Sequence, residues 1–140
     1  MPMTHGKLKF FVIVFPLTVG CGQHPANFRT VNPAPLELIC SFAEKTQMFE
    51  TSVEIDEEQL QGNLVVFDTR HKFFVEKITG SVAREDGFWI FKSIDKSDSV
   101  TTSREHRISQ ANLAYERKSL VQMGDTEPLT IFNRGQCARV

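Results

Sequence analysis

The residues best able to do chemistry in this 140-residue chain are its four histidines and three cysteines. Their spacing matches no catalytic motif: the sequence has no phosphate-binding loop, no dinucleotide glycine fingerprint, no Gly-x-Ser-x-Gly and no His-Glu-x-x-His. His71 and His106 stand among polar residues, whereas a metal site needs three or four ligands that converge on one point. We therefore expect solvated surface histidines, no metal, no cofactor and no enzyme activity.

Cys21 follows a segment that is typical of an export signal. Lys7 and Lys9 precede an apolar run that continues to Val19, and the chain beyond Cys21 becomes polar. A basic start, an apolar run and small residues before the cut define a secretory signal peptide. The run is shorter than the ~20 apolar residues of a membrane-spanning helix. Residues 1–20 are thus predicted to be a signal peptide, and the protein to be located in the cell envelope, as a membrane-anchored, periplasmic or secreted protein.

The junction Leu17-Thr18-Val19-Gly20-Cys21 resembles the lipobox of bacterial lipoproteins, with Thr18 standing where leucine is most common. This resemblance implies cleavage before Cys21 and a diacylglycerol on its sulfur. Because two or more acyl chains hold a protein on a membrane stably, such a protein stays tethered. The alternatives are an ordinary secretory signal cut near Gly20 and an uncleaved anchor.

Cys40 and Cys137 lie near the two ends of the predicted body and form an even pair if Cys21 carries lipid. An oxidising compartment then favours a disulfide between them. Closing a loop of this size stabilises a fold by about 4–5 kcal/mol in the chain-entropy account. Two free buried thiols are the alternative.

Length and charge restrict the remaining possibilities. Removal of residues 1–20 leaves 120 residues, which is the size of one domain with its own core. The whole chain has 16 basic and 17 acidic residues, and the signal segment contains two of the lysines and no acid, so the rest has a net charge of −3. Mixed charge of this kind argues against nucleic acid as a partner. Residues 21–35, with three prolines, are predicted to be a tether.

Residues 36–140 follow the period-two pattern of half-buried strands and are predicted to be a single β domain. Turn signals divide them into seven or eight strands, and Asp86-Gly87 is the clearest of these signals because it supplies the positive φ of a tight hairpin. Val100–Ile108 looks like an exposed or edge strand, Leu113–Val121 could be a strand or a helix, and Asn133–Gly135 looks like a turn. The expected fold class is all-β, an antiparallel meander forming a small barrel or a sandwich.

The C-terminal third of the chain, which ends on Gly135-Gln136-Cys137, is similar to the last strands of small uncharacterised exported proteins of proteobacteria and their phages. Those proteins likewise place a cysteine early in the body and finish on Gly-x-Cys. The resemblance implies a fold and a disulfide, and it implies no activity.

Two adjacent aromatic pairs, Phe73-Phe74 and Phe88-Trp89, suggest where the protein binds a partner. Neighbouring side chains of a strand point to opposite faces, so one aromatic of each pair faces away from the core. Phe74 and Trp89 are therefore expected to form an exposed apolar patch of the kind that marks a partner site. The alternative is that these aromatics fill the core.

The function predicted from these features is a non-catalytic binding or envelope-accessory role for a lipid-anchored β-protein, with the membrane and an envelope protein as partners. One alternative is a periplasmic lipoprotein similar to the lysozyme inhibitors, which are small disulfide-tied antiparallel barrels. Another is a barrel that carries a small apolar ligand in its interior.

Overall fold

The computed structural model describes residues 32–140. The predicted signal peptide, the lipidation site Cys21 and most of the predicted tether lie outside this range. Pro33–Val140 form one compact unit. Within the described residues, no helix has the length and hydrophobicity that a membrane span requires.

Nine strands make up this unit, so the all-β antiparallel class is confirmed and the strand number is slightly higher than expected. They are β1 (Leu36–Glu44), β2 (Gln47–Asp56), β3 (Gln61–Asp68), β4 (Phe73–Ser81), β5 (Ala83–Glu85), β6 (Phe88–Ser97), β7 (Val100–Ser109), β8 (Ala114–Met123) and β9 (Leu129–Arg139). They form a single sheet with the order β4-β3-β2-β1-β9-β8-β7-β6-β5.

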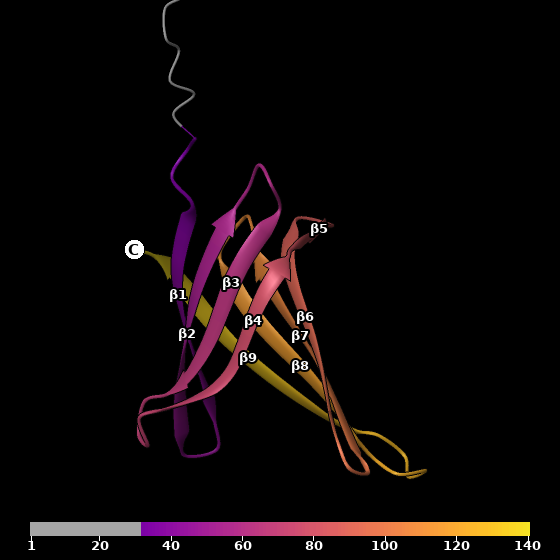
Figure 1. Cartoon of the computed structure of the whole chain (residues 1–140). Helices are drawn as coiled ribbons and strands as arrows, with labels where there is room; N and C mark the ends of the chain where they lie inside the picture. The colour runs from indigo at the N-terminus through magenta and orange to yellow at the C-terminus, as the bar shows by residue number, and fades with distance from the viewer. Residues whose placement is uncertain (1–31) are drawn as a thin grey trace, which may run out of the picture. The chain divides into compact units, whose positions relative to one another are not determined.

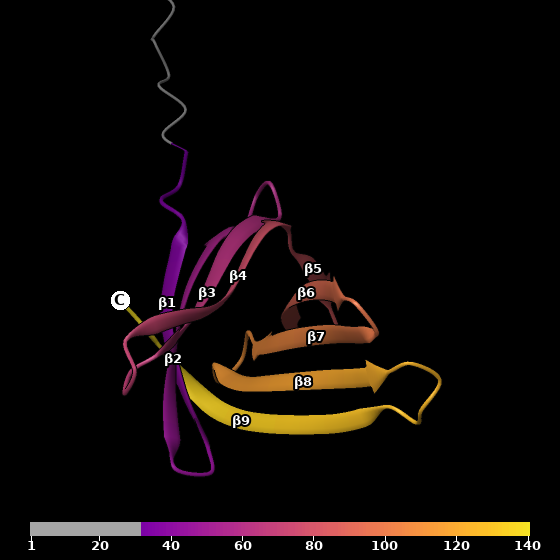
Figure 2. The ribbon, with the colours of Figure 1, turned by 60° about the horizontal axis from the view of Figure 1, so that its bottom comes forward.

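The sheet curls into a nearly closed barrel with two walls, β1–β4 and β5–β9 (Figure 1). On one side the walls meet where β1 pairs with β9, which we call the joint. On the other side β4 approaches β6 without forming a ladder with it, and we call this line the seam. In Figure 2, β7, β8 and β9 run side by side as long strands of the second wall. Figure 1 shows the walls close together at the β5 end and further apart toward the hairpins at the other end.

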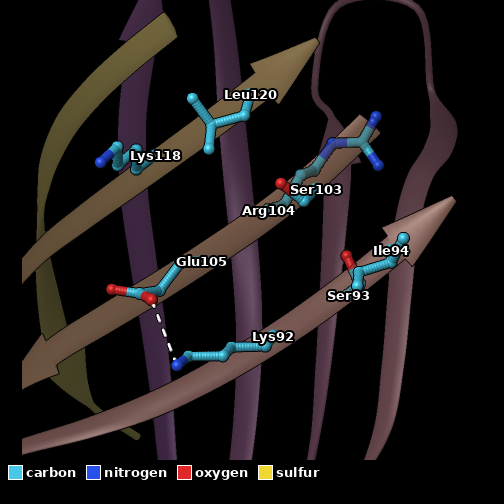
Figure 3. A pocket seen from close by; sticks show the side chains of 8 residues that line it. All are labelled: Lys92, Ser93, Ile94, Ser103, Arg104, Glu105, Lys118 and Leu120. Atoms are coloured by element: carbon cyan, nitrogen blue, oxygen red, sulfur yellow. Dashed lines mark ion pairs between the residues drawn. The ribbon is translucent and has the colours of Figure 1, made fainter. Parts of the chain in front are cut away.

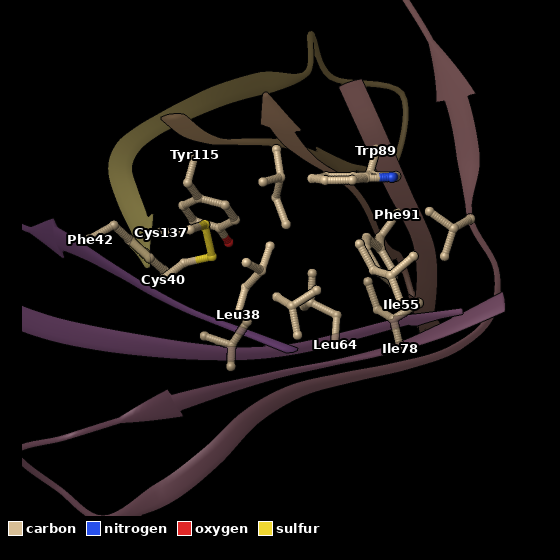
Figure 4. Packing of buried hydrophobic residues seen from close by; sticks show 14 of the residues in the cluster. Leu38, Cys40, Phe42, Ile55, Leu64, Ile78, Trp89, Phe91, Tyr115 and Cys137 are labelled. Carbon is tan, nitrogen blue, oxygen red and sulfur yellow. A yellow bond between two sulfur atoms is a disulfide. The ribbon is translucent and has the colours of Figure 1, made fainter. Parts of the chain in front are cut away.

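Alternate residues of the strands fill the barrel. In β2, Phe49, Thr51, Val53 and Ile55 are buried while the residues between them are exposed, as the period-two pattern predicts. Figure 4 shows how side chains of both walls interleave, with Leu38, Leu64 and Phe91 among the most buried. Full burial of one such side chain stabilises the fold by about 1.5–3 kcal/mol.

The joint carries a covalent link. Cys40 lies directly opposite Cys137 in the β1–β9 ladder, and the two form a disulfide (Figure 4). The predicted pairing is therefore confirmed, and it fastens the first strand to the last.

Three local expectations have clear outcomes. The hairpin turn at Asp86-Gly87 is confirmed, with φ of 50° and 79° between β5 and β6. The expectation that Val100–Ile108 forms an exposed or edge strand is wrong, because β7 lies between β6 and β8 and its residues are half-buried or buried. The segment Leu113–Val121, for which strand and helix are both compatible with the sequence, forms most of strand β8.

The turn expected at Asn133–Gly135 does not exist, since β9 runs through it. At Gly135 the strand changes partner: β8 pairs with β9 up to Gln136, and β1 pairs from Gly135 onward. A Cβ at Gly135 would collide with the carbonyl of Ser41. The glycine therefore permits the close approach of β9 to β1, not a reversal of the chain.

Candidate functional site

The two aromatics expected to form one patch lie in different environments. Phe74 is 75% exposed, whereas Trp89 is 3% exposed and packs in the core (Figure 4). The expectation of a patch containing Trp89 is therefore wrong. One aromatic of that pair does face outward, but it is Phe88, whose ring lies under the Arg107 guanidinium at 4.5 Å. Phe88 and Trp89 thus point to opposite faces of β6, as predicted, but Trp89 is the one that points into the core. The sequence of β6 does not determine this choice, because it depends on how the neighbouring strands pack.

Phe74 belongs to an exposed apolar surface at the start of β4, which we call the hairpin patch: Phe67, Phe73, Phe74 and Val75. Phe73 and Val75 are also exposed, at 53% and 36%. The rings of Phe67 and Phe74 meet edge to face with centroids 5.5 Å apart. A register shift leaves Val75 as an extra residue in β4. Successive side chains of a strand point to opposite faces of the sheet. Since Phe73, Phe74 and Val75 are all exposed, both faces of β4 are open to solvent at this end of the β3–β4 pair.

The turn before the hairpin patch is held by one buried carboxylate. Asp68 accepts hydrogen bonds from the backbone N–H groups of Arg70 and His71, both at 2.9 Å, and its other oxygen lies 2.9 Å from His71 Nδ1. The backbone and side-chain hydrogen bonds of His71 hold the pKa of Asp68 below its usual value. Asp68 is thus occupied within the turn, while Arg70 and Lys72 face solvent.

A second exposed surface lies on the outside of the second wall. A pocket of about 210 Å³ opens over β6, β7 and β8 (Figure 3). It is lined by Lys92, Ser93, Ile94, Ser103, Arg104, Glu105, Lys118 and Leu120. A neighbouring pocket shares Glu105 and Lys118 with it and extends to Phe132 on β9.

The register of the strands orders this surface, which we call the outer face, into rows. One row is Ile94, Ser103 and Leu120, and the next is Lys92, Glu105, Lys118 and Phe132. Lys92 Nζ lies 3.5 Å from Glu105 Oε2 (Figure 3). Apolar side chains therefore alternate on this face with charges of both signs.

Between the two surfaces, a buried polar network spans the seam. Glu76 of β4 accepts a 2.6 Å hydrogen bond from Ser93 Oγ of β6, and its other oxygen lies 3.0 Å from His106 Nε2 of β7. His106 Nδ1 lies 2.7 Å from the hydroxyl of Tyr115. Arg117 Nη2 lies 3.8 Å from Glu76. Side chains, not a backbone ladder, connect the walls at this point.

A second arginine extends the network toward the surface. Arg104 Nη1 lies 3.9 Å from Glu76 and 2.6 Å from Asp95 Oδ2. Its guanidinium therefore stands between the buried carboxylate of β4 and an exposed carboxylate of β6, both of which it can partly neutralise.

The ionisation states of the network follow from its contacts. Burial on its own would raise the pKa of Glu76, but hydrogen bonds from His106 and Ser93 and the charges of His106 and Arg104 hold it below its usual value. An ionised carboxylate only accepts, so the Nε2 proton of His106 points at Glu76. Burial raises the pKa of Tyr115, which stays protonated near neutral pH.

The network does not form a nucleophilic triad. Ser93 is bonded to the carboxylate, and both ring nitrogens of His106 are occupied by Glu76 and Tyr115. A serine nucleophile needs a free imidazole nitrogen within hydrogen-bond reach, and this arrangement offers none. In residues 32–140 no group of three or more His, Cys, Asp or Glu side chains converges as a metal site would.

His106 also corrects the expectation of a surface histidine, since it is wholly buried. The sequence holds a signal for this: His106 shares its strand face with Ile108, and Arg117 shares its face with Tyr115, so strict alternation places all four inside. Only the three-dimensional arrangement identifies Glu76 as the common partner of His106 and Arg117.

Comparison of the chain with family models, curated proteins and solved structures finds no match.

Proposed function

We propose that this is an exported, membrane-tethered binding protein without catalytic activity, which docks an envelope protein on the outer face of its second wall. The observation that carries the proposal is the arrangement of apolar and charged side chains in rows across that face. Exposed apolar side chains, Ile94 at 67% and Phe132 at 49%, stand beside a pocket and among charged residues. Non-obligate protein interfaces likewise combine apolar contacts with polar and charged side chains.

The signs of the charges support a protein as the partner. Lys92 and Lys118 flank Glu105 in one row, and Arg107, Glu116 and Arg134 form the next. A surface with interspersed charges of both signs selects a partner of complementary pattern.

Export and tethering rest on the cysteines. A disulfide at the joint is typical of an oxidising compartment, which for a bacterial protein lies beyond the inner membrane. With Cys40 and Cys137 paired, Cys21 is the third cysteine and follows the lipobox-like segment. Its lipidation would place the protein permanently on a membrane of the envelope.

The interior of the barrel is filled, which favours binding at the surface over binding inside. The interior is occupied by side chains of both walls, and the seam adds an ionised carboxylate to it. An apolar ligand inside the barrel would have to displace packed residues such as Phe91 and Ile108. The carrier alternative is accordingly less well supported than docking on the outer face.

Site-specific photo-crosslinking in the native host tests the proposal. A photoreactive residue at Ile94 or Lys118 should give one discrete adduct, and the same residue at Glu57, in the exposed β2–β3 turn, serves as the matched control. Leu120→Asp, added to the protein that carries the photoreactive residue at position 118, should abolish the adduct while the melting temperature changes little. Equal adducts at all three positions, or none at the two outer-face positions, would contradict the proposal.

A further inference from the structure

We infer that the hairpin patch is a second docking site, and that its partner is an anionic lipid surface. This inference is independent of the outer face, from which it differs in wall, in composition and in charge. Three consecutive side chains of β4, Phe73, Phe74 and Val75, are exposed together. Exposed aromatic and aliphatic side chains beside cations are the composition that inserts into the headgroup region of a bilayer.

The hairpin presents only positive charge to its surroundings. From Asp68 to Lys77 it contains two acids and three bases besides His71. Both acids, Asp68 and Glu76, are buried and bonded within the protein. The bases Arg70, Lys72 and Lys77 are all exposed. A membrane surface rich in anionic lipid therefore meets cations on both sides of the apolar residues.

The charge pattern favours lipid over a protein partner. On the outer face, apolar residues lie among charges of both signs, which can pair with opposite charges on a protein partner. On the hairpin, the apolar residues are contiguous and the exposed charges have one sign, which complements a uniformly negative surface. Glu50, which lies opposite Phe67 in the β2–β3 ladder, is an exposed acid beside the patch and is the place to strengthen binding by mutation.

The hairpin is formed before any contact with lipid. The Asp68 hydrogen bonds hold the turn, and Thr69 donates to the carbonyl of Met48 both from its backbone nitrogen at 3.2 Å and from its hydroxyl at 2.9 Å. Because little of the hairpin has to be ordered on binding, the cost of association is reduced.

Flotation with lipid vesicles tests the inference. The protein used is residues 21–140 with Cys21→Ser, so that neither the apolar signal segment nor an acyl chain contributes, and the vesicles are phosphatidylcholine with or without phosphatidylglycerol. Binding should require phosphatidylglycerol and weaken with salt. Each basic residue at a membrane surface contributes about fivefold, so Arg70→Ser/Lys72→Ser should weaken binding by about 25-fold. Phe73→Ser/Phe74→Ser should weaken it at least as much, and Glu50→Lys should strengthen it.

The matched control is Ile94→Ser/Phe132→Ser, which removes two exposed apolar residues from the outer face. It should bind vesicles as the parent protein does. Equal binding by the parent and both hairpin variants would overturn the inference, because the remaining chain would then be responsible. Hairpin-dependent binding to an acidic protein without binding to anionic vesicles would also overturn it.

A fluorescence measurement separates insertion from simple adsorption. Phe74→Trp places an indole in the patch, while Trp89 is buried in the core and acts as an internal reference. Lipids brominated on their acyl chains should quench the Phe74→Trp protein and leave the parent unchanged. Absence of additional quenching in the variant would contradict insertion of the patch.

Discussion

The two walls of the barrel contact each other along two lines, the joint and the seam, and different interactions hold each of them. At the joint, β1 and β9 share a backbone ladder and a disulfide between Cys40 and Cys137. At the seam, β4 and β6 share no ladder, and the carboxylate of Glu76 connects them through Ser93 and His106. The joint is covalent and insensitive to acid, whereas the seam depends on one ionised group.

This difference matters for function because the seam lies between the two exposed surfaces. Glu76 follows Val75 of the hairpin patch directly, and Ser93 precedes Ile94 of the outer face. Their 2.6 Å hydrogen bond therefore links the strand that carries the hairpin patch to a strand of the outer face. Buried ion pairs of this kind often add little net stability, but breaking one is costly because the remaining charges lose their partner.

The largest effect is expected at the joint. Cys40→Ser/Cys137→Ser should lower the free energy of unfolding by about 4–5 kcal/mol, since 97 residues separate the two cysteines and the unfolded chain gains the entropy of that loop. Denaturant unfolding measures the loss, and Cys21→Ser is the control that should change nothing. A loss below about 1 kcal/mol would mean that the disulfide is not important for closure.

At the seam, Glu76→Ala should lower the free energy of unfolding by about 3–5 kcal/mol, because the buried side chains of His106 and Arg117 lose their carboxylate partner. Val66→Ala, at the position opposite Glu76 in the β3–β4 ladder, is the matched control for lost side-chain volume. If both variants lose the same stability, the seam is held by packing and not by charge.

Acid should affect the seam and leave the joint intact. The pKa of Glu76 in the folded protein lies below its value in the unfolded chain, so its stabilisation is complete at neutral pH and is lost as the pH falls through the folded pKa. The difference in unfolding free energy between the parent and Glu76→Gln should therefore narrow as the pH falls below about 5 and through the folded pKa. Asp68 titrates in both proteins and cancels in the comparison. A constant difference would mean that folding does not change the pKa of Glu76.

The smallest effect is expected beside the seam, at Phe74. Phe74→Ala should change the unfolding free energy by less than about 0.5 kcal/mol, because its side chain faces solvent. Trp89→Ala, in the core of the second wall, should cost about 3–5 kcal/mol. A large loss in Phe74→Ala would assign the hairpin patch to the folded core and would remove it as a docking site.

Much of the barrel can be predicted from the sequence, because alternation, turn chemistry and cysteine parity are local or countable. These properties identify the β2 strand, the Asp86-Gly87 turn and the Cys40–Cys137 pairing. They fail where the outcome depends on a neighbouring strand. The pattern places Trp89 on the wrong face, and it predicts a turn at Gly135, although this glycine allows β9 to cross close to β1.

The candidate site is harder to predict from the sequence, because it too depends on which strands are neighbours. Phe74 can be identified, since adjacent aromatics in a strand cannot both be inside. The buried network cannot, because Glu76, His106 and Tyr115 are far apart in the chain and each is ordinary in its local context. The outer face depends on register, which places Lys118 of β8 beside Glu105 of β7.

The most direct test of the central claim is the intact mass of the protein recovered from membranes of a bacterial host that expresses the full gene. We predict a chain that starts at Cys21 and carries added acyl mass, and that gains two hydrogens on reduction as the Cys40–Cys137 disulfide opens. An unprocessed chain without acyl groups, with three free thiols, would contradict export, tethering and the proposed envelope partner together.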